Sequence, residues 1–268
     1  TIPFIARYRK EVTGSLDDSV LRTLDEKLTA LRNLAQRKQE VQDLIGAQGK
    51  LTEEVRAAIE RAATVTEVDD IYRPFRPKRK TRASVARERG LEDLAILLFA
   101  QEKSYTPSIE EQAARFVDPE REVPDVAAAL QGAMDIVAEE VSDNADYRRE
   151  LRRLTFDAGS LTSKAAKEDD SVYAMYYDFS EPLRKLPGHR ILAIHRGEKE
   201  EFLKVALTVP EDVVLGYLYN RVLSGNRSPA EPYVREAITD AYNRLIAPSI
   251  EREIRNDLFD TACEGAIK

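Results

Sequence analysis

Apolar residues recur three or four positions apart over much of the chain, which is the period of an amphipathic α-helix. The clearest case is segment 16–45, where leucine, valine and isoleucine repeat at this spacing. Ser15 is a suitable N-cap, two aspartates occupy the first turn, and Gly46 and Gly49 end the pattern. The pattern predicts one helix of about 30 residues, roughly 45 Å long. A helix of that length typically packs against a partner helix or spans between two lobes.

Shorter helices are predicted after this segment by the same period, with caps or helix breakers between them. The predicted segments are 53–63, 66–72, 82–89, 91–102, 109–117, 125–141 and 146–158, followed by 212–224, 231–247 and 249–268. Segment 91–102 is apolar nearly all round, so we expect it to be buried. Pro248 either kinks or restarts the last helix, because proline lacks a backbone N–H.

The pattern changes between residues 160 and 209. The stretches LTSKAAK (161–167) and FLKVALTV (202–209) are the best strand candidates, and we expect them to pair as an antiparallel ribbon. A short helix bounded by Pro187 and Gly197 is predicted between them. The chain as a whole is therefore predicted to be mainly α, multi-helical, with one long helix and at most a small two-stranded β ribbon.

Three segments follow from this organisation. Residues 1–122 form an N-terminal helical region, 123–209 a helical segment with the ribbon, and 210–268 a set of C-terminal helices.

Composition places the chain among cytoplasmic, helix-rich proteins. The 268 residues suit one large domain or two or three small ones, with 43% hydrophobic and 33% charged residues and no tryptophan. The longest apolar run, Leu94 to Ala100, is about a third of a membrane span, so no membrane partner is expected. The single Cys263 forms no internal disulfide and no CxxC pair, which agrees with a reducing compartment.

Charge is distributed unevenly. The net charge of −7 opposes a nucleic-acid footprint over the whole surface. Residues 72–89, however, hold eight Lys or Arg against one acid, Glu88. This local excess of +7 leaves −14 for the rest of the chain, since −7 − 7 = −14.

The stretch YRPFRPKRKTR (72–82) is the core of that excess. Pro74 and Pro77 are expected to push Arg73 and Arg76 out of the α region and to give an extended, polyproline-II-like segment. The period of three would place the two aromatic rings on one edge, against the helices, with arginines on another edge. The candidate nucleic-acid-binding residues are Arg73, Arg76, Lys78, Arg79, Lys80 and Arg82. Two interpretations stay open: phosphate binding, or charges that only keep an exposed connector solvated.

A second basic cluster lies in segment 146–158. Its members are Arg148, Arg149, Arg152 and Arg153. They could form a secondary basic face that contacts phosphate, or pair with acids such as Glu139 and Glu140, and the spacing favours the structural role.

The sequence contains few residue patterns that are typical of a catalytic site. His189 and His195 are six residues apart, so they would not share a helix face as metal ligands do. The P-loop, GxGxxG, GxSxG and HExxH motifs do not occur. We therefore expect no catalytic residues, no metal and no cofactor, and a protein that is not an enzyme.

Four stretches resemble the Tex-like family of bacterial transcription accessory proteins. They are TIPFIARYRKEVTGSLDD, DIYRPFRPKRKTRASVARERGLEDLA, FSEPLRKLPGHRILAIHRGEKEEFLKV and RLIAPSIEREIRNDLFDTACEGAIK, in that order over nearly the whole chain. The resemblance implies an N-terminal helical region with helix-turn-helix-like elements. It also implies that a ribonuclease-H-like domain, helix-hairpin-helix elements and an S1 nucleic-acid-binding domain follow elsewhere in the parent protein.

Two functions follow as expectations from this resemblance and the charge pattern. The first is a non-catalytic region giving auxiliary phosphate contacts to RNA or DNA, the main contacts being made by domains outside this chain. The alternative is a scaffold between domains, or a docking surface for transcription-machinery proteins, without nucleic-acid binding of its own.

Overall fold

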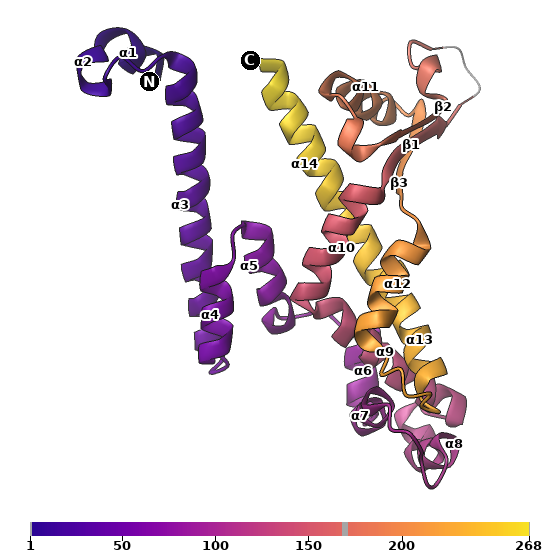
Figure 1. Cartoon of the computed structure of the whole chain (residues 1–268). Helices are drawn as coiled ribbons and strands as arrows, with labels where there is room; N and C mark the ends of the chain where they lie inside the picture. The colour runs from indigo at the N-terminus through magenta and orange to yellow at the C-terminus, as the bar shows by residue number, and fades with distance from the viewer. Residues whose placement is uncertain (1, 168–170, 268) are drawn as a thin grey trace. The chain divides into compact units, whose positions relative to one another are not determined.

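The computed structural model describes residues 2–167 and 171–267. The chain forms two compact units, residues 1–77 and 78–268. It is mainly helical with one small antiparallel sheet, as predicted (Figure 1). The boundaries predicted at residues 122 and 209 both lie inside the second unit, and they stay a prediction.

The first unit is built from short helices around one long helix. Its elements are α1 (Ile2–Tyr8), α2 (Lys10–Thr13), α3 (Asp18–Ala47), α4 (Glu53–Arg61), α5 (Val65–Tyr72) and the 3₁₀ turn η1 (Arg73–Phe75). The 30-residue α3 is the long helix that the pattern predicts. Its N-cap is Asp17, which accepts a hydrogen bond from the Val20 N–H at 2.9 Å, and not Ser15. Ser15 has a φ of 67° and lies in the turn before the helix.

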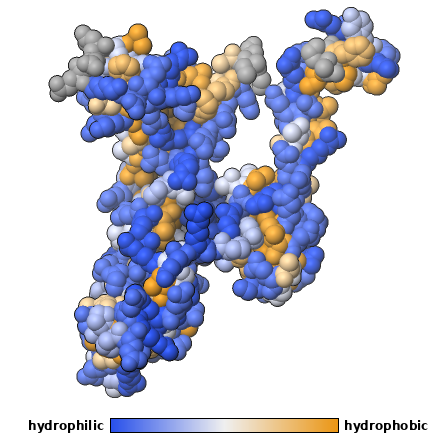
Figure 2. Space-filling model, turned by 180° about the vertical axis from the view of Figure 1, so that it is seen from behind, coloured by the Kyte–Doolittle hydropathy of each residue, from blue (hydrophilic) through white to orange (hydrophobic). Residues whose placement is uncertain are grey.

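The core of the first unit involves only the C-terminal half of α3. Val41 and Ile45 are fully buried against Ile59 of α4 and Val68 of α5. In the N-terminal half Leu21 is buried, but Leu24, Leu28 and Leu31 stay exposed. Figure 2 shows hydrophobic residues in orange on the surface of the part that holds α1 to α3. The two halves of α3 therefore differ in what covers their apolar side.

The second unit is organised around α9. Its helices are α6 (Arg82–Glu88), α7 (Glu92–Ala100), α8 (Ile109–Ala113), α9 (Val126–Asp143), α10 (Ala145–Ala158), α11 (Gly188–Lys199), α12 (Glu211–Val222), α13 (Glu231–Asp240) and α14 (Ala247–Ile267), with the short turns η2 (Ala114–Phe116), η3 (Pro119–Arg121), η4 (Ala174–Tyr176) and η5 (Leu183–Lys185). Ten residues of α9 are buried, and small ones such as Ala129 and Ala133 let α6, α7 and α13 pack closely against it. Only one face of α7 is buried, through Leu94, Ala95 and Leu98, while Ile96 and Phe99 are exposed, so the expected burial is confirmed only in part.

The sheet has three strands where the sequence predicts two. The predicted pair is confirmed as β1 (Ser160–Ala165) and β3 (Leu203–Thr208), and β2 (Asp178–Pro182) adds to the other side of β1. The sequence of β2, DFSEP, contains one large apolar residue and ends in proline. It therefore lacks the apolar alternation that identifies a strand, and it forms because β1 offers an unpaired edge.

Helix α11 packs beside this sheet (Figure 1). Gly197 was expected to end the helix, but α11 continues to Lys199. A side-chain carbon at Gly197 would lie 2.7 Å from the Leu203 side chain and 3.0 Å from the ring of Tyr173. This glycine therefore serves close packing between α11 and β3 and does not terminate the helix.

The C-terminal helices run on without a break. A π-helical segment, η6 (Ala241–Ile246), joins α13 to α14 just before Pro248. The wider π turn accommodates the missing N–H of the proline, so of the two outcomes expected at Pro248, a kink or a restart, the restart does not occur. Within the described residues, no helix is both long enough and apolar enough to span a membrane.

Candidate nucleic-acid interface

The basic segment 72–82 is less extended than predicted. Arg73 lies in the helical region (φ −49°, ψ −47°), because α5 continues into the η1 turn with Pro74 near its start. The expectation that Pro74 would force Arg73 out of the α region is therefore wrong. Arg76 is extended (φ −65°, ψ 131°), as its position before Pro77 predicts.

The aromatic residues of the segment dock on the first unit, as predicted. Tyr72 is buried in the cluster formed by α3, α4 and α5, and the half-buried Phe75 packs against the same cluster. The Phe75 carbonyl accepts a hydrogen bond from the Gln48 side chain at 2.9 Å. The guanidinium of Arg76 lies 5.5 Å from the centre of the Tyr72 ring, which is cation–π distance. Arg73 is half-buried.

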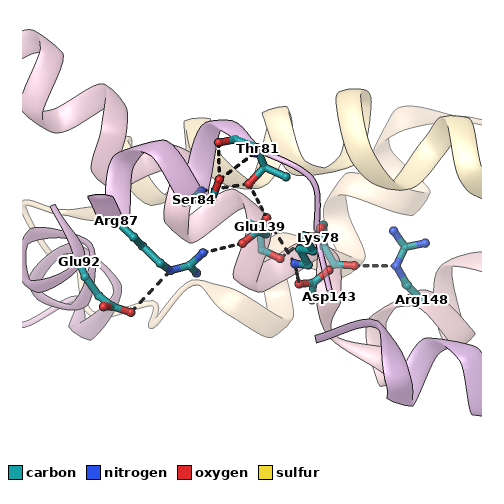
Figure 3. Close-up of polar contacts among 9 residues, drawn as sticks. Lys78, Thr81, Ser84, Arg87, Glu92, Glu139, Asp143 and Arg148 are labelled. Atoms are coloured by element: carbon teal, nitrogen blue, oxygen red, sulfur yellow. Dashed lines mark hydrogen bonds and ion pairs between the residues drawn. The ribbon is translucent and has the colours of Figure 1, made fainter. Parts of the chain in front are cut away.

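Lys78 is neutralised inside the second unit. Its ammonium pairs with Asp143 and lies 3.3 Å from the carboxylate of Glu139, both near the C-terminus of α9 (Figure 3). Glu139 also accepts hydrogen bonds from Arg87 at 2.7 Å and from the Thr81 hydroxyl at 3.1 Å. Lys78 is therefore an anchor that holds the start of the second unit, residues 78–82, on α9, and it is not a free cation.

The pKa of Glu139 reflects this arrangement. Burial on its own would raise the pKa, but the hydrogen bond from Arg87, the charge of Lys78 and the hydrogen bond from Thr81 lower it below the usual glutamate value. The carboxylate is therefore ionised at neutral pH and compensates its two cationic neighbours.

Arg79 and Lys80 differ from the anchor beside them. Both side chains are exposed, and neither forms an ion pair with any residue that the structure describes. The charge of Lys80 contributes a minor part of the lowered pKa of Glu122, whose main partner is Arg89. The two adjacent cations are thus the part of the predicted site that remains available to an anion.

Arg82 is exposed at the first turn of α6 and faces a cleft of about 380 Å³ that also contains Asp135 and Asp240. Burial raises the pKa of Asp135, while a hydrogen bond from Gln131 and the charges of Arg244 and Arg82 oppose that rise. The charge of Arg82 is therefore partly used within the second unit.

The second basic cluster does not form an exposed basic face. Arg148 is 1% exposed and donates to the Ser142 carbonyl at 2.6 Å, to the Ser249 hydroxyl at 2.8 Å and to the Leu245 carbonyl at 3.5 Å. Because the Arg148 guanidinium donates its hydrogen bonds to these groups, Arg148 is unavailable to phosphate. The pairing with Glu139 or Glu140 that the sequence suggested is replaced by these partners.

The other three arginines of α10 have acidic partners. Arg152 pairs with Glu253 of α14 at 2.8 Å, and Arg149 pairs with Asp146 at 2.9 Å. Arg153 donates to Glu150, which is the main cause of its raised pKa, and also pairs with Asp157 at 2.8 Å. The structural interpretation of this cluster is the one that the contacts support.

The histidines lie on α11, and both are exposed. The ring of His195 stacks on Phe259 of α14 with 4.0 Å between ring centres. Among the described residues, no three His, Cys, Asp or Glu side chains come together in a group that could hold a metal ion.

Sequence reasoning did not identify Glu139 and Asp143 as the anchor of the segment. Their spacing of four residues places both on one face of α9, which was a readable signal for a cation partner. Thr81 and Ser84 form a reciprocal capping box at the start of α6, and Thr81 also donates to Glu139. The cap and the anchor together fix residues 78–84 within the second unit.

Fold and site define a mainly α protein with a small sheet and a basic segment whose charge is only partly neutralised. The chain belongs to the Tex-like family: residues 104–268 match the family model described as Tex central region-like, and residues 1–46 match the Tex-like protein N-terminal domain.

Several curated proteins are similar over the whole length of the chain. Uncharacterized protein YdcI of Bacillus subtilis is 43% identical over 100% of this chain and 37% of its own length. Transcriptional accessory protein Tex of Neisseria gonorrhoeae is 35% identical over 100% of this chain and 36% of its own. The human S1 RNA-binding domain-containing protein 1 is 30% identical over 98% of this chain and 27% of its own length. The chain therefore spans little more than a third of the length of its bacterial relatives.

Proposed function

We propose that this chain is a non-catalytic, cytoplasmic part of a transcription accessory protein that gives auxiliary phosphate contacts to nucleic acid through Arg79 and Lys80. The observation that carries the proposal is that both cations are exposed and lack an ion pair among the described residues, while the neighbouring Lys78 is fixed on α9. Arg76, three residues before Arg79, is exposed and is a weaker third contact, because its guanidinium lies against Tyr72.

The family supports this proposal at a coarser level. One relative is named as a transcriptional accessory protein and another for an S1 RNA-binding domain. We propose that the principal nucleic-acid contacts are made by other parts of the full-length protein. The role of this chain would then be to add sequence-independent affinity, which is what phosphate contacts supply.

The test is binding of labelled single-stranded RNA and single-stranded DNA at low salt to the 268-residue chain. Both probes are needed, because phosphate contacts are common to RNA and DNA. The double variant Arg79→Ala/Lys80→Ala is compared with Lys103→Ala/Arg115→Ala, a matched control that removes two exposed cations without ion pairs among the described residues. We expect binding to weaken at least fivefold in the first variant and less than twofold in the control, since each lost phosphate contact costs about 0.5–1 kcal/mol. Equal weakening in both would attribute binding to net charge alone and contradict the proposal.

A specific observation also favours the scaffold alternative. Leu24, Leu28 and Leu31 of α3 are 56%, 40% and 63% exposed, although they lie on one side of the helix. Exposed leucines in a row are typical of a surface that another protein element covers. Undetectable RNA binding at low salt, together with binding of a purified transcription protein that Leu24→Glu/Leu31→Glu abolishes, would establish this alternative instead.

A further inference from the structure

A cleft of about 400 Å³ opens in the second unit between α11, α14 and the sheet. Its apolar part is formed by Leu161 of β1 with Ile191 and Ile194 of α11, all buried, and by the half-buried Val205 of β3. Its polar side comes from α14. The cleft uses none of the residues assigned to the phosphate contacts.

One edge of the sheet borders this cleft. Thr162 of β1 faces Ala206 of β3, and the Ala166 N–H donates to the Phe202 carbonyl at 2.8 Å. Because hydrogen-bonded pairs alternate in an antiparallel ladder, Val205 and Leu207 direct their backbone groups away from β1. The Leu207 N–H accordingly donates to a carboxylate oxygen of Glu251 on α14, at 3.3 Å.

Val205 is an unpaired position of this edge. Its backbone N–H and C=O point to the same side as those of Leu207, toward α14, and no hydrogen bond from a described residue satisfies them. Unpaired strand edges bind extended peptides through backbone hydrogen bonds, and a neighbouring pocket selects the side chain. The edge therefore favours a peptide over other ligands.

The charge at the rim selects for an acid. Arg255 pairs with Glu198 and lies 3.8 Å from Glu251, so its charge is compensated. Arg252 is exposed and forms no ion pair with a described residue. The cleft thus combines an apolar floor with one cation, Arg252, that has no ion-pair partner among the described residues, beside a Glu251 carboxylate that already pairs with Arg255.

We propose that this cleft binds a short extended peptide of a partner protein, which pairs with Val205 at the edge of β3. An apolar side chain of the peptide fills the space between α11 and α14, and a neighbouring Asp or Glu pairs with Arg252. A nucleotide fits less well, since the lining is mostly apolar and the His195 ring already stacks on Phe259. This surface and its protein partner go beyond the phosphate contacts proposed above.

The experiment selects a phage-displayed library of random heptapeptides on the immobilised 268-residue chain, and the enriched peptides are synthesised with a fluorescent label. We expect enriched sequences to carry an apolar residue within two positions of Asp or Glu. Fluorescence polarisation then compares the wild type with Arg252→Glu, and with the control Arg227→Glu, another exposed arginine without an ion pair among the described residues. Arg252→Glu should weaken binding about tenfold or more, because it replaces an attraction to the peptide acid by a repulsion, and the control should change it less than twofold.

A second variant tests the strand edge. Val205→Pro removes the outward N–H, which a sheet tolerates at an edge because the ladder does not use it. Peptide binding should be lost while circular dichroism and the melting temperature show a folded chain. If this variant does not fold, the Arg252→Glu comparison decides alone.

Three results would overturn the proposal. They are a library with no enriched sequences, enriched peptides that bind Arg252→Glu as well as the wild type, or a 12-nucleotide RNA that displaces the peptides and loses affinity in Arg252→Glu. None of them bears on the Arg79→Ala/Lys80→Ala comparison, so failure here is distinguishable from failure of the proposed function.

Discussion

At the scale of single residues, the decisive distinction is between cations that the protein uses itself and cations that it leaves available. Lys78, Arg79 and Lys80 are adjacent in the sequence, and nothing in their local pattern separates them. The partners of Lys78 are 61 and 65 positions away, since 139 − 78 = 61 and 143 − 78 = 65. The spacing of Glu139 and Asp143 signals a cation partner but not which cation, so the sequence predicted the basic segment but not which of its charges are compensated.

The Glu139 anchor has a measurable pH dependence. The folded-state pKa of Glu139 lies below the ordinary value of 4.5, so its stabilisation is fully present above about pH 4.5 and is lost as pH falls through the folded-state pKa. Glu139→Gln should lower the free energy of unfolding by about 1–2 kcal/mol at pH 7, because two cations lose a largely buried partner that is only partly replaced by water. Urea denaturation at pH 7 and at pH 3.5 measures the difference, which should shrink at the lower pH.

The control for this prediction is Glu102→Gln, which changes an exposed glutamate without an ion pair among the described residues. It should leave the unfolding free energy within about 0.5 kcal/mol of the wild type at pH 7. A Glu139→Gln effect that persists undiminished at pH 3.5 would contradict the electrostatic account of the anchor.

At the scale of secondary-structure elements, periodicity predicted most helices and the β1–β3 pair, because each has a local signal. It missed β2, whose formation depends on the edge that β1 offers. It also missed the π-helical segment before Pro248, where the Leu245 carbonyl accepts hydrogen bonds from Arg148 and Ser249. Proline within a helix signalled that carbonyls would need other partners, but the sequence did not show that an arginine of α10 supplies one.

Arg148 and Arg149 therefore have opposite roles despite being adjacent. Arg148→Ala should lower the free energy of unfolding by about 3 kcal/mol or more, because buried carbonyls and a hydroxyl lose their donor and a cavity forms. Arg149→Ala, which removes an exposed ion pair, should cost less than about 0.5 kcal/mol. Urea denaturation of both variants checks this, and similar effects would mean that the buried guanidinium is not what holds α10 to the π-helical segment.

The two halves of α3 should also respond differently to substitution. Val41→Ala should cost about 2 kcal/mol, since Val41 is fully buried in the first unit. Leu24→Glu and Leu31→Glu should each change the unfolding free energy by less than about 0.5 kcal/mol, because those side chains are exposed in this chain. Thermal or urea unfolding distinguishes the cases, and a large loss in Leu31→Glu would show that the N-terminal half of α3 is covered in solution.

At the scale of the whole molecule, the sequence shows that positive charge is concentrated in residues 72–89. The structure shows that internal ion pairs neutralise part of this charge. The excess of +7 over residues 72–89 includes Lys78, Arg87 and Arg89, all of which have acidic partners in the second unit. The uncompensated charge is therefore small, while the net charge of the chain is −7. Weak binding with a shallow salt dependence is the behaviour that this balance predicts for a polyanion, and the number of contacts can be read from the slope.

The salt dependence supplies the sharpest test of how many phosphates this chain contacts. For single-stranded nucleic acid the slope of log K against log salt concentration is about −0.7 per neutralised phosphate, so two contacts by Arg79 and Lys80 should contribute about −1.4. The slope measured for single-stranded RNA between 20 and 100 mM salt (about the range in which weak complexes remain measurable) should flatten by that amount in Arg79→Ala/Lys80→Ala. Lys78→Ala should flatten it by less than about 0.3, since its ammonium is held by Asp143 and Glu139 and releases no phosphate counterion. An equal flattening in Lys78→Ala would mean that RNA displaces the internal carboxylates, and the division between anchoring and phosphate-binding cations would then be wrong.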